Sequence, residues 1–254
     1  MLDKFRRRNY ELENLDRGSY TAEEYEECIS ELQLVNEWLG DARALKRTLL
    51  KDVRKNQLQK FSVLDVGAGS GELLRVAAAW ARETKRDFRG VGLELNERSA
   101  EAINEQSTAF DEITSVRSDA RCLPFASGLF DYVICSLFTH HFVEVEIIDI
   151  LHEMSRVARR RIFVIDLHRH AIAYYFYTTI GTLFLHNRLL REDGALSILR
   201  GFKPRELYEL AVQAELLKPR VTRHFPYRLV LSALAEPPSS SIASAPSNVR
   251  IFRR

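Results

Sequence analysis

Two hydrophobic patterns alternate along the middle of the chain. Short apolar runs rich in β-branched and aromatic residues lie at 61–66, 88–95, 113–116, 130–137 and 161–167. Between them, apolar residues recur at helical spacing, as in 72–82 and 144–158. Strands that alternate with helices in this way predict a doubly wound α/β fold with a mostly parallel sheet and helices on both faces.

The two ends of the chain have patterns of their own. Thr21 and Glu24 have capping-box spacing ahead of a helical apolar repeat that ends at Gly40, and a second helical pattern covers 41–55. We therefore expect an N-terminal helical cap over 1–58 and a main domain over 59–235. The segment 236–254 is rich in Ser and Pro and has no apolar periodicity, which predicts a disordered tail.

A glycine-rich turn follows the first predicted strand, where 65–71 reads DVGAGSG. Glycines permit a sharp turn and a close approach of a ligand, and the helix that follows offers free N–H groups. The spacing is not the G-x-x-x-x-G-K-[ST] of a nucleoside triphosphatase, and a dinucleotide fold would prefer G-x-G-x-x-G. The carboxylate of Asp65, two residues before Gly67, suits a ligand that carries an ammonium or sulfonium group.

Polar residues also follow the next predicted strands. Glu94 ends the second strand, where a carboxylate can accept hydrogen bonds from a ribose diol. Asp119 follows the third strand and can accept a hydrogen bond from an adenine amino group. A stretch that reads FDYVICSLFTHHF, at 130–142, includes the fourth strand and its end. Such sheets bind ligands at the carboxyl ends of their strands, so these residues predict one binding site.

Together these motifs resemble the class I S-adenosylmethionine (SAM) dependent methyltransferases, in order, over about residues 60–167. The resemblance implies SAM as the cofactor and a seven-stranded sheet whose last strand is antiparallel, for which 225–233 is the candidate. LFTHHF at 137–142, DLH at 166–168 and DGALS at 193–197 narrow the resemblance to bacterial small-molecule methyltransferases of polyketide and quinone pathways.

The resemblance also implies cofactor contacts for residues at the strand ends. The turn would line the methionine part of SAM, Glu94 would hold the ribose, and Leu95 would pack beside the adenine. The residues after the third strand would read the adenine edge, and those after the fourth would lie near the sulfonium. The full set is Asp65, Gly67, Ala68, Gly69, Glu94, Leu95, Asp119, Ala120, Ser136 and Leu137.

Histidines near the same strand ends are candidate bases, because a phenol with a pKa of about 10 must lose its proton before it accepts a methyl group. His140 and His141 follow the fourth strand, and we expect only one of them to face the pocket. Asp166 and His168 point the same way if the chain is extended there, which would orient His168. Surface or purely structural roles are the alternatives. None of these histidines has H-E-x-x-H spacing, so we predict no metal.

An apolar stretch at 171–185 contains five aromatic residues among 15. It is shorter than the roughly 20 residues that a membrane-spanning helix needs. Three interpretations stay open: a hydrophobic lid over the acceptor, within an insertion at about 168–202; a buried helix or dimer face; and peripheral docking at a membrane surface beside Arg169 and Arg188.

The composition is that of an ordinary globular protein. Lys and Arg total 37 against 35 for Asp and Glu, which disfavours a nucleic-acid partner. Three scattered cysteines and the absence of a secretory signal predict a cytoplasmic protein, as a monomer or homodimer. We expect a SAM-dependent methyltransferase acting on an oxygen, or a carbon, of a hydrophobic aromatic or polyketide-like small molecule. The alternatives are a SAM-binding protein without turnover and an RNA or protein methyltransferase.

Overall fold

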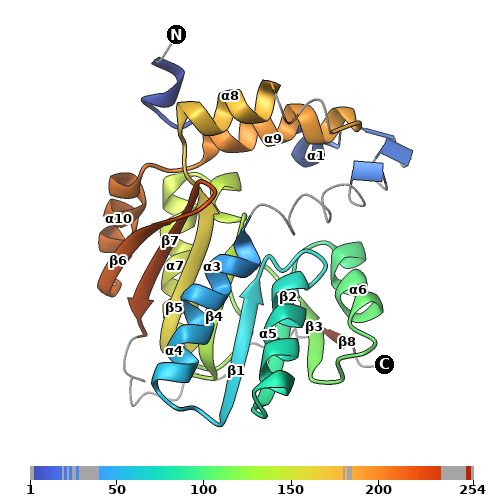
Figure 1. Ribbon diagram of the computed structural model, residues 1–254, viewed down its shortest axis with the longest axis vertical. Helices are drawn as coiled ribbons and strands as arrows, with labels where there is room; N and C mark the ends of the chain where they lie inside the picture. The colour runs from blue at the N-terminus through green and yellow to red at the C-terminus, as the bar shows by residue number, and fades with distance from the viewer. Residues whose placement is uncertain are drawn as a thin grey trace.

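One sheet forms the centre of the protein, in the strand order β6-β7-β5-β4-β1-β2-β3-β8 (Figure 1). The computed structural model describes residues 3–18, 20–21, 23–24, 27–28, 40–179, 181, 185–235 and 250–252. The strands are β1 (Lys60–Val66), β2 (Asp87–Glu94), β3 (Ile113–Arg117), β4 (Phe130–Ser136), β5 (Ala158–Leu167), β6 (Leu217–His224), β7 (Arg228–Leu234) and β8 (Arg250–Phe252). Strands β1 to β5 are parallel, whereas β7 is antiparallel to β5 and β6.

The strands β1 to β7 confirm the predicted fold class, with β7 as the antiparallel strand. Strand β6 was not predicted. Its residues are exposed or half-buried, because it lies at the edge of the sheet, and it therefore has no continuous apolar face. Strand β8 was not predicted either, and it pairs antiparallel with β3.

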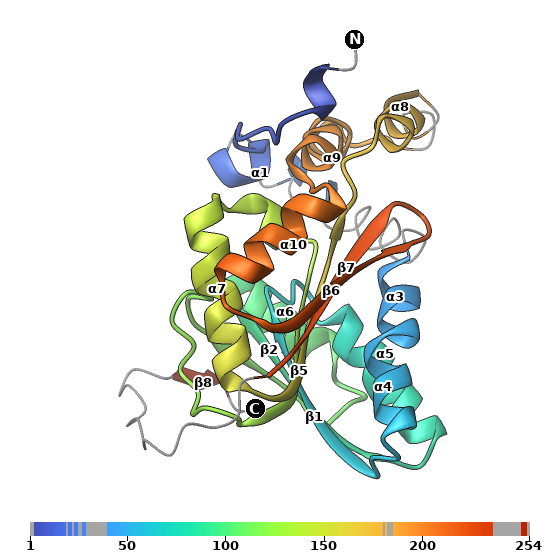
Figure 2. The same ribbon diagram turned by 90° about the vertical axis from the view of Figure 1, so that its left-hand side faces the viewer.

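Helices cover both faces of the sheet (Figure 2). Neighbouring strand residues point to opposite faces, so Val63 packs with the core on one side and Leu64 with the core on the other. The Leu64 face carries α7 (Glu144–Val157) and α10 (Pro204–Gln213). The Val63 face carries α3 (Asp41–Arg47), α4 (Leu49–Lys55), α5 (Glu72–Glu83) and, through Ile103, α6 (Glu97–Gln106).

The structure divides the predicted N-terminal cap. Helices α3 and α4 belong to a face of the sheet, because Leu45, Leu49 and Val53 are fully buried against it. Residues 3–18, with the short helices η1 (Asp3–Phe5) and α1 (Asn14–Arg17), lie instead above the carboxyl ends of the strands, beside α9 (Figure 1). The first predicted helix, over 21–39, lies mostly outside the described residues.

Helices α8 (Ala171–Thr179) and α9 (Arg188–Arg200) follow β5, where the lid insertion was expected, and also lie above the carboxyl ends of the strands (Figures 1 and 2). Among the described helices, none is long and apolar enough to cross a membrane. Most of the predicted disordered tail lies outside the described residues. The part that is described, 250–252, is the strand β8, whose backbone pairs with β3.

Candidate active site

A cavity of about 780 Å³ lies at the carboxyl ends of the strands. One side, which we call the cofactor half, is lined by the glycine turn 65–71, Glu94, Ser136 and Leu137, together with part of α6. The other side, the acceptor half, is lined by Glu13, the short helix η2 (Thr139–His141), His168, α8 and α9. The single cavity therefore joins the residues that the sequence assigns to cofactor and to acceptor.

Two glycines of the turn have different reasons to be glycine. Gly67 has φ 69°, and a Cβ there would lie 2.3 Å from Cδ2 of Phe138, so only glycine permits this close approach. Gly69 has φ 57°, and a Cβ there would meet nothing within 4 Å. Gly69 therefore leaves free space over the turn, where a ligand can reach the backbone.

Two buried polar atoms of the cofactor half have no hydrogen-bond partner within the described chain. They are Oδ1 of Asp65, whose residue is 2 % exposed, and Oγ of Ser136. An unsatisfied buried polar group costs about 1–3 kcal/mol, so a ligand that donates to it gains binding energy. Burial, and then the charge of Glu94, raises the pKa of Asp65 well above its usual value. A cationic amino group, such as that of SAM, fits this position because it would satisfy Oδ1 and stabilise the charge.

Glu94 ends β2 and faces the same space. Its Oε1 accepts a hydrogen bond from the N–H of Gly69 at 2.5 Å, which links the strand end to the turn. Burial raises the pKa of Glu94 to about 7, although hydrogen bonds from the N–H groups of Gly69 and Leu95 act in the opposite direction. A ribose diol would find a carboxylate here above neutral pH.

Three residues predicted to contact adenine do not line the cavity. Leu95 is 63 % exposed, and Ala120 is buried elsewhere. The carboxylate of Asp119 accepts hydrogen bonds from the N–H and the guanidinium of Arg121, which lower its pKa. In the described part of the chain, this end of the cavity is lined instead by residues of α6 that the motif analysis missed: Arg98, Ser99, Ala102 and Gln106. The sequence signal for them was Asn96, which caps α6 two residues after Glu94.

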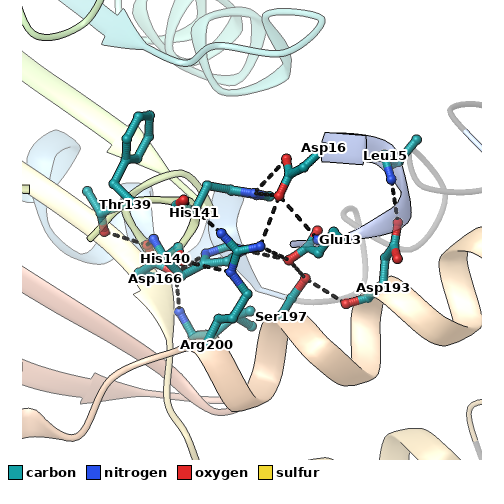
Figure 3. Close-up of polar contacts among 12 residues, drawn as sticks. Glu13, Leu15, Asp16, Thr139, His140, His141, Asp166, Asp193, Ser197 and Arg200 are labelled. Carbon is teal, nitrogen blue, oxygen red and sulfur yellow. Dashed lines mark hydrogen bonds and ion pairs between the residues drawn. The ribbon is translucent and has the colours of Figure 1, made fainter. Parts of the chain in front are cut away.

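His140 is buried and is held by a carboxylate (Figure 3). Its ring nitrogen Nδ1 lies 2.7 Å from Oδ1 of Asp166, and its backbone N–H donates to Oδ2 of Asp166. Burial would raise the pKa of Asp166, but the charge and hydrogen bond of His140, with further hydrogen bonds from Thr139 and Leu167, lower it to about 2. Asp166 is therefore ionised and favours a proton on Nδ1 of His140, which leaves Nε2 as the basic nitrogen.

The predicted pairing of Asp166 with His168 was wrong. Strand β5 ends at Leu167, so the alternation that would place the two side chains on one side does not continue to His168. His168 lines the cavity, and burial, followed by the charges of His170 and other nearby cations, lowers its pKa to about 4. His168 is thus a weak base, and Asp166 contacts His140 instead of orienting His168.

Both adjacent histidines line the cavity, although only one was expected to do so. The tight turn of η2 brings their ring centroids to 4.3 Å with an interplanar angle of 34°, so that both rings reach the same side. Nδ1 of His141 lies 3.3 Å from the carboxylate of Asp16 (Figure 3). Burial raises the pKa of Asp16, but the contacts with His141 and Arg200 outweigh it and lower the pKa to about 2.

Glu13 comes from the N-terminal segment and completes this wall. Its Oε1 accepts a hydrogen bond from Oγ of Ser197 at 2.7 Å and lies 3.9 Å from Nε2 of His140. Burial raises the pKa of Glu13, although His141, Ser197 and Arg200 act against it. Sequence reasoning missed Glu13, because no local motif marks it.

Two buried arginines hold the N-terminal segment in place. The guanidinium of Arg8 donates to the carbonyl groups of His140, Phe142 and Arg200. Arg200 donates to the carbonyl groups of His140 and His141 and forms an ion pair with Asp16 at 2.9 Å (Figure 3). These contacts join the segment to η2 and α9, and they therefore position Glu13.

The far end of the acceptor half is apolar. Phe176 and Tyr177 of α8 line it, as the interpretation of 171–185 as a lid would require. The other apolar lining residues at this end are Leu15, Cys28, Ala173, Leu185, Leu190 and Ile198. A hydrophobic molecule would fit between this wall and His140.

Comparison with known proteins gives a domain and a fold. Residues 63–161 match the family model for a methyltransferase domain. No curated protein matches the chain. A SAM-dependent methyltransferase from Aquifex aeolicus is 17 % identical, with a TM-score of 0.55 over 80 % of this chain and 98 % of its own. The magnesium protoporphyrin IX methyltransferase of Synechocystis with bound SAH is 17 % identical, with a TM-score of 0.54 over 78 % and 84 %. The CurJ carbon methyltransferase is 10 % identical, with a TM-score of 0.63 over 87 % and 63 %.

Proposed function

We propose that this class I SAM-dependent methyltransferase, whose methyltransferase domain spans residues 63–161, methylates an oxygen or carbon of a hydrophobic, aromatic or polyketide-like small molecule with His140 as the general base. The single observation that carries the proposal is the buried Asp166–His140 pair at the wall of the acceptor half. A base in that position suits an acceptor that must lose a proton before it can react.

The cofactor half supports the first part of the proposal. SAM supplies an electrophilic methyl group on a positively charged sulfur when it is bound. Asp65 would hold its amino group and Glu94 its ribose, while Gly67, Ala68 and Gly69 present backbone to it. Ser136 and Leu137 would lie beside the sulfur, at the end of β4. Leu137 has φ 50° and donates from its N–H to the carbonyl of Ile165, so the turn there has a defined shape.

The adenine end needs a rearrangement of side chains. The carboxylate of Asp119 is bound by Arg121, and both side chains are partly exposed. To accept a hydrogen bond from the adenine amino group, the carboxylate of Asp119 would have to bind Arg121 and adenine together, or release Arg121. We keep Asp119, Ala120 and Leu95 in the proposed site because they follow β2 and β3, next to Glu94 and the α6 residues that line the cavity.

His140 would remove the proton of the acceptor. The proton moves from the acceptor oxygen or carbon to Nε2, and the ionised Asp166 stabilises the imidazolium that forms. The electron pair left on the acceptor would then receive the methyl group that SAM, held by Asp65 and Glu94, would supply, and SAH would be the second product. Positioned bases of this kind contribute about 10²–10⁴-fold to rates. His168 is less suited, because its pKa of about 4 makes it a weak proton acceptor.

The walls of the acceptor half favour a hydrophobic acceptor. The apolar residues of α8 and α9 would surround such a molecule and exclude water, which strengthens the interactions of charged groups inside. The buried ion pair between Asp41 and Arg228, with Nε 2.6 Å from Oδ1, also lines the cavity. It is a polar contact available to a hydroxyl or carbonyl group of the acceptor.

The test compares His140→Gln with His168→Gln as the matched control in the same cavity. Methyl transfer is measured by mass spectrometry with phenols, enolic β-dicarbonyl compounds, RNA and a protein lysate as acceptors, and S-adenosylhomocysteine (SAH) binding by calorimetry. We expect transfer to a phenolic or enolic compound, a loss of at least about 100-fold in His140→Gln with unchanged SAH affinity, and a much smaller loss in His168→Gln.

Other outcomes would reject the proposal in distinct ways. Transfer to RNA or protein alone would reject the small-molecule acceptor. Tight SAH binding without transfer to any acceptor would indicate a SAM-binding protein without turnover. Full activity of His140→Gln would reject the base.

A further inference from the structure

Three side chains of the acceptor half can act together as metal ligands. Glu13, His140 and His141 each offer one ligand atom, and these atoms all lie within 4.8 Å of one another (Figure 3). Glu13 and His140 are almost fully buried, whereas His141 is half-buried and faces the cavity. The group thus combines two imidazoles and one carboxylate at the wall of an accessible space.

Both histidines are backed by carboxylates. Nδ1 of His140 lies 2.7 Å from Asp166, and Nδ1 of His141 lies 3.3 Å from Asp16. A histidine that binds a metal through one ring nitrogen usually donates a hydrogen bond from the other to a carboxylate or carbonyl group. For His140 this leaves Nε2 as the ligand atom, 3.9 Å from Oε1 of Glu13.

The charges around the group also favour a cation. Glu13, Asp16 and Asp166 contribute three carboxylates, and the guanidinium in contact with Glu13 and Asp16 is that of Arg200. Arg8, which lies nearby, forms its ion pair with Glu144 instead. With neutral histidines the carboxylates exceed the guanidinium charge, and a divalent cation would balance them in a place where water screens little.

We propose that Glu13, His140 and His141 bind one divalent transition-metal ion of the zinc type. Two nitrogens and one carboxylate oxygen are a ligand set that suits zinc, and the cavity leaves a further position open to water or to an acceptor oxygen. These three residues form no local sequence motif such as H-E-x-x-H, because Glu13 lies far from the histidines along the chain and reaches them only in the folded protein.

Metal binding and the proposed base use the same atom. A metal ion on Nε2 of His140 takes the lone pair that would accept the proton of the acceptor. If the metal-free enzyme uses His140 as its base, the addition of zinc is therefore expected to slow its methyl transfer. The metal site goes beyond the proposed function, and its test does not require turnover.

The test is a titration of the full chain, freed of metal by a chelator, with Zn²⁺ by calorimetry and with Co²⁺ by visible absorption. The chain carries Cys122→Ser, because Cys122 is an exposed thiol that would itself bind zinc. We expect one equivalent of Zn²⁺ to bind and Co²⁺ to develop the intense bands of a four- or five-coordinate site. Glu13→Gln and His141→Ala should each lower the affinity by at least about 10-fold.

Two matched variants control for other histidines. His168→Ala removes a histidine of the same cavity that is not in the group, and His152→Ala removes an exposed one on α7. Both should keep the affinity for Zn²⁺. SAH binding and thermal unfolding confirm that each variant is folded.

The proposal is overturned if the folded chain binds neither ion. It is also overturned if Glu13→Gln binds Zn²⁺ as tightly as its parent, or if His168→Ala or His152→Ala loses binding. The base is tested separately, by the activity of the chelator-treated chain, so either idea can fail while the other survives.

Discussion

The cofactor half and the acceptor half of the cavity are built in different ways. The cofactor half is built around one continuous stretch, 65–71, together with Glu94 at the end of β2, part of the adjoining α6, and Ser136 and Leu137 at the end of β4. The acceptor half brings together three stretches that are far apart in sequence, around 13–16, 139–141 and 193–200, and holds them by side-chain contacts (Figure 3).

This difference predicts different responses to mutation. A strand, a tight turn and a helix form locally, so the cofactor half depends on backbone conformation at a few positions. The acceptor half depends on contacts of the buried guanidinium groups of Arg8 and Arg200. A change in one half should therefore leave the other measurable, and the following predictions test that separation.

The largest effect is expected from Arg200→Met. Arg200 is 3 % exposed and joins Asp16, His140 and His141, so its loss removes the guanidinium partner of the Asp16 carboxylate and the side-chain donor to the carbonyl of His141. Breaking a buried pair costs about 3–5 kcal/mol, and we expect urea unfolding to show a loss of this size, with faster amide exchange in 3–18.

Arg205→Met is the matched control for that variant. Arg205 is 89 % exposed and forms a helical ion pair with Glu209, which is worth about 0.3–0.5 kcal/mol. SAH should still bind to folded Arg200→Met, because the cofactor half does not use this residue. Equal losses in the two variants would contradict the role given to Arg200.

A smaller loss of stability is expected from Gly67→Ala, with Gly18→Ala as control. Both glycines have positive φ, 69° and 67°, so both variants incur the left-handed penalty of about 1–2 kcal/mol. Only at Gly67 would the new Cβ also collide with Phe138. Overpacking adds about 1–3 kcal/mol, so urea unfolding should separate the two, and SAH binding should weaken only in Gly67→Ala. Identical behaviour would reject the steric argument.

The cofactor half should respond to pH through Glu94. Its pKa in the folded chain, about 7, exceeds the ordinary value of 4.5, so the folded chain binds the proton more tightly than the unfolded chain does. Stability from this group is therefore complete below pH 4.5 and is lost as the pH rises through 7. SAH affinity should change in the opposite direction if the ionised carboxylate holds the ribose. Below pH 7 it should then decrease by up to about 10-fold for each pH unit, because the fraction of ionised Glu94 decreases by that factor.

Glu94→Gln tests the origin of both trends. The amide does not titrate, so both slopes should flatten between pH 5 and 8 when SAH binding is followed by calorimetry and unfolding by urea. A slope in SAH affinity that persists in Glu94→Gln would assign it to another group, with Asp65 as the first to examine because its pKa is also raised.

The smallest effect is expected from Asp119→Ala. The carboxylate is shared with Arg121 and partly exposed, so the loss of one hydrogen bond to adenine is worth about 1 kcal/mol, or a few-fold in SAH affinity. Asp149→Ala, at an exposed position of α7, is the control and should leave SAH affinity unchanged. No change in Asp119→Ala would remove Asp119 from the proposed site.

Much of the architecture and of the cofactor half could be predicted from the sequence. Periodicity located β1 to β5, β7 and the helices between them, because burial of one or both faces repeats at short range. In parallel sheets the strand ends gather at one edge, so the motifs alone were enough to bring Asp65, Gly67, Gly69 and Glu94 together. A methyltransferase domain and its fold were predicted from those motifs; residues 63–161 match the family model of a methyltransferase domain, and solved methyltransferases share the fold. The acceptor, the location and the oligomeric state stay predictions.

Only the tertiary structure decided how the acceptor half is assembled. The sequence named Asp166, His140 and His168 as candidates, but the wrong histidine was paired with the carboxylate, because the end of β5 and the turn of η2 decide where the side chains point. Glu13 reaches His140 because Arg8 and Arg200 hold 3–18 over the sheet. Contacts between distant segments depend on how the whole chain packs, whereas elements and strand ends depend on patterns within a few residues.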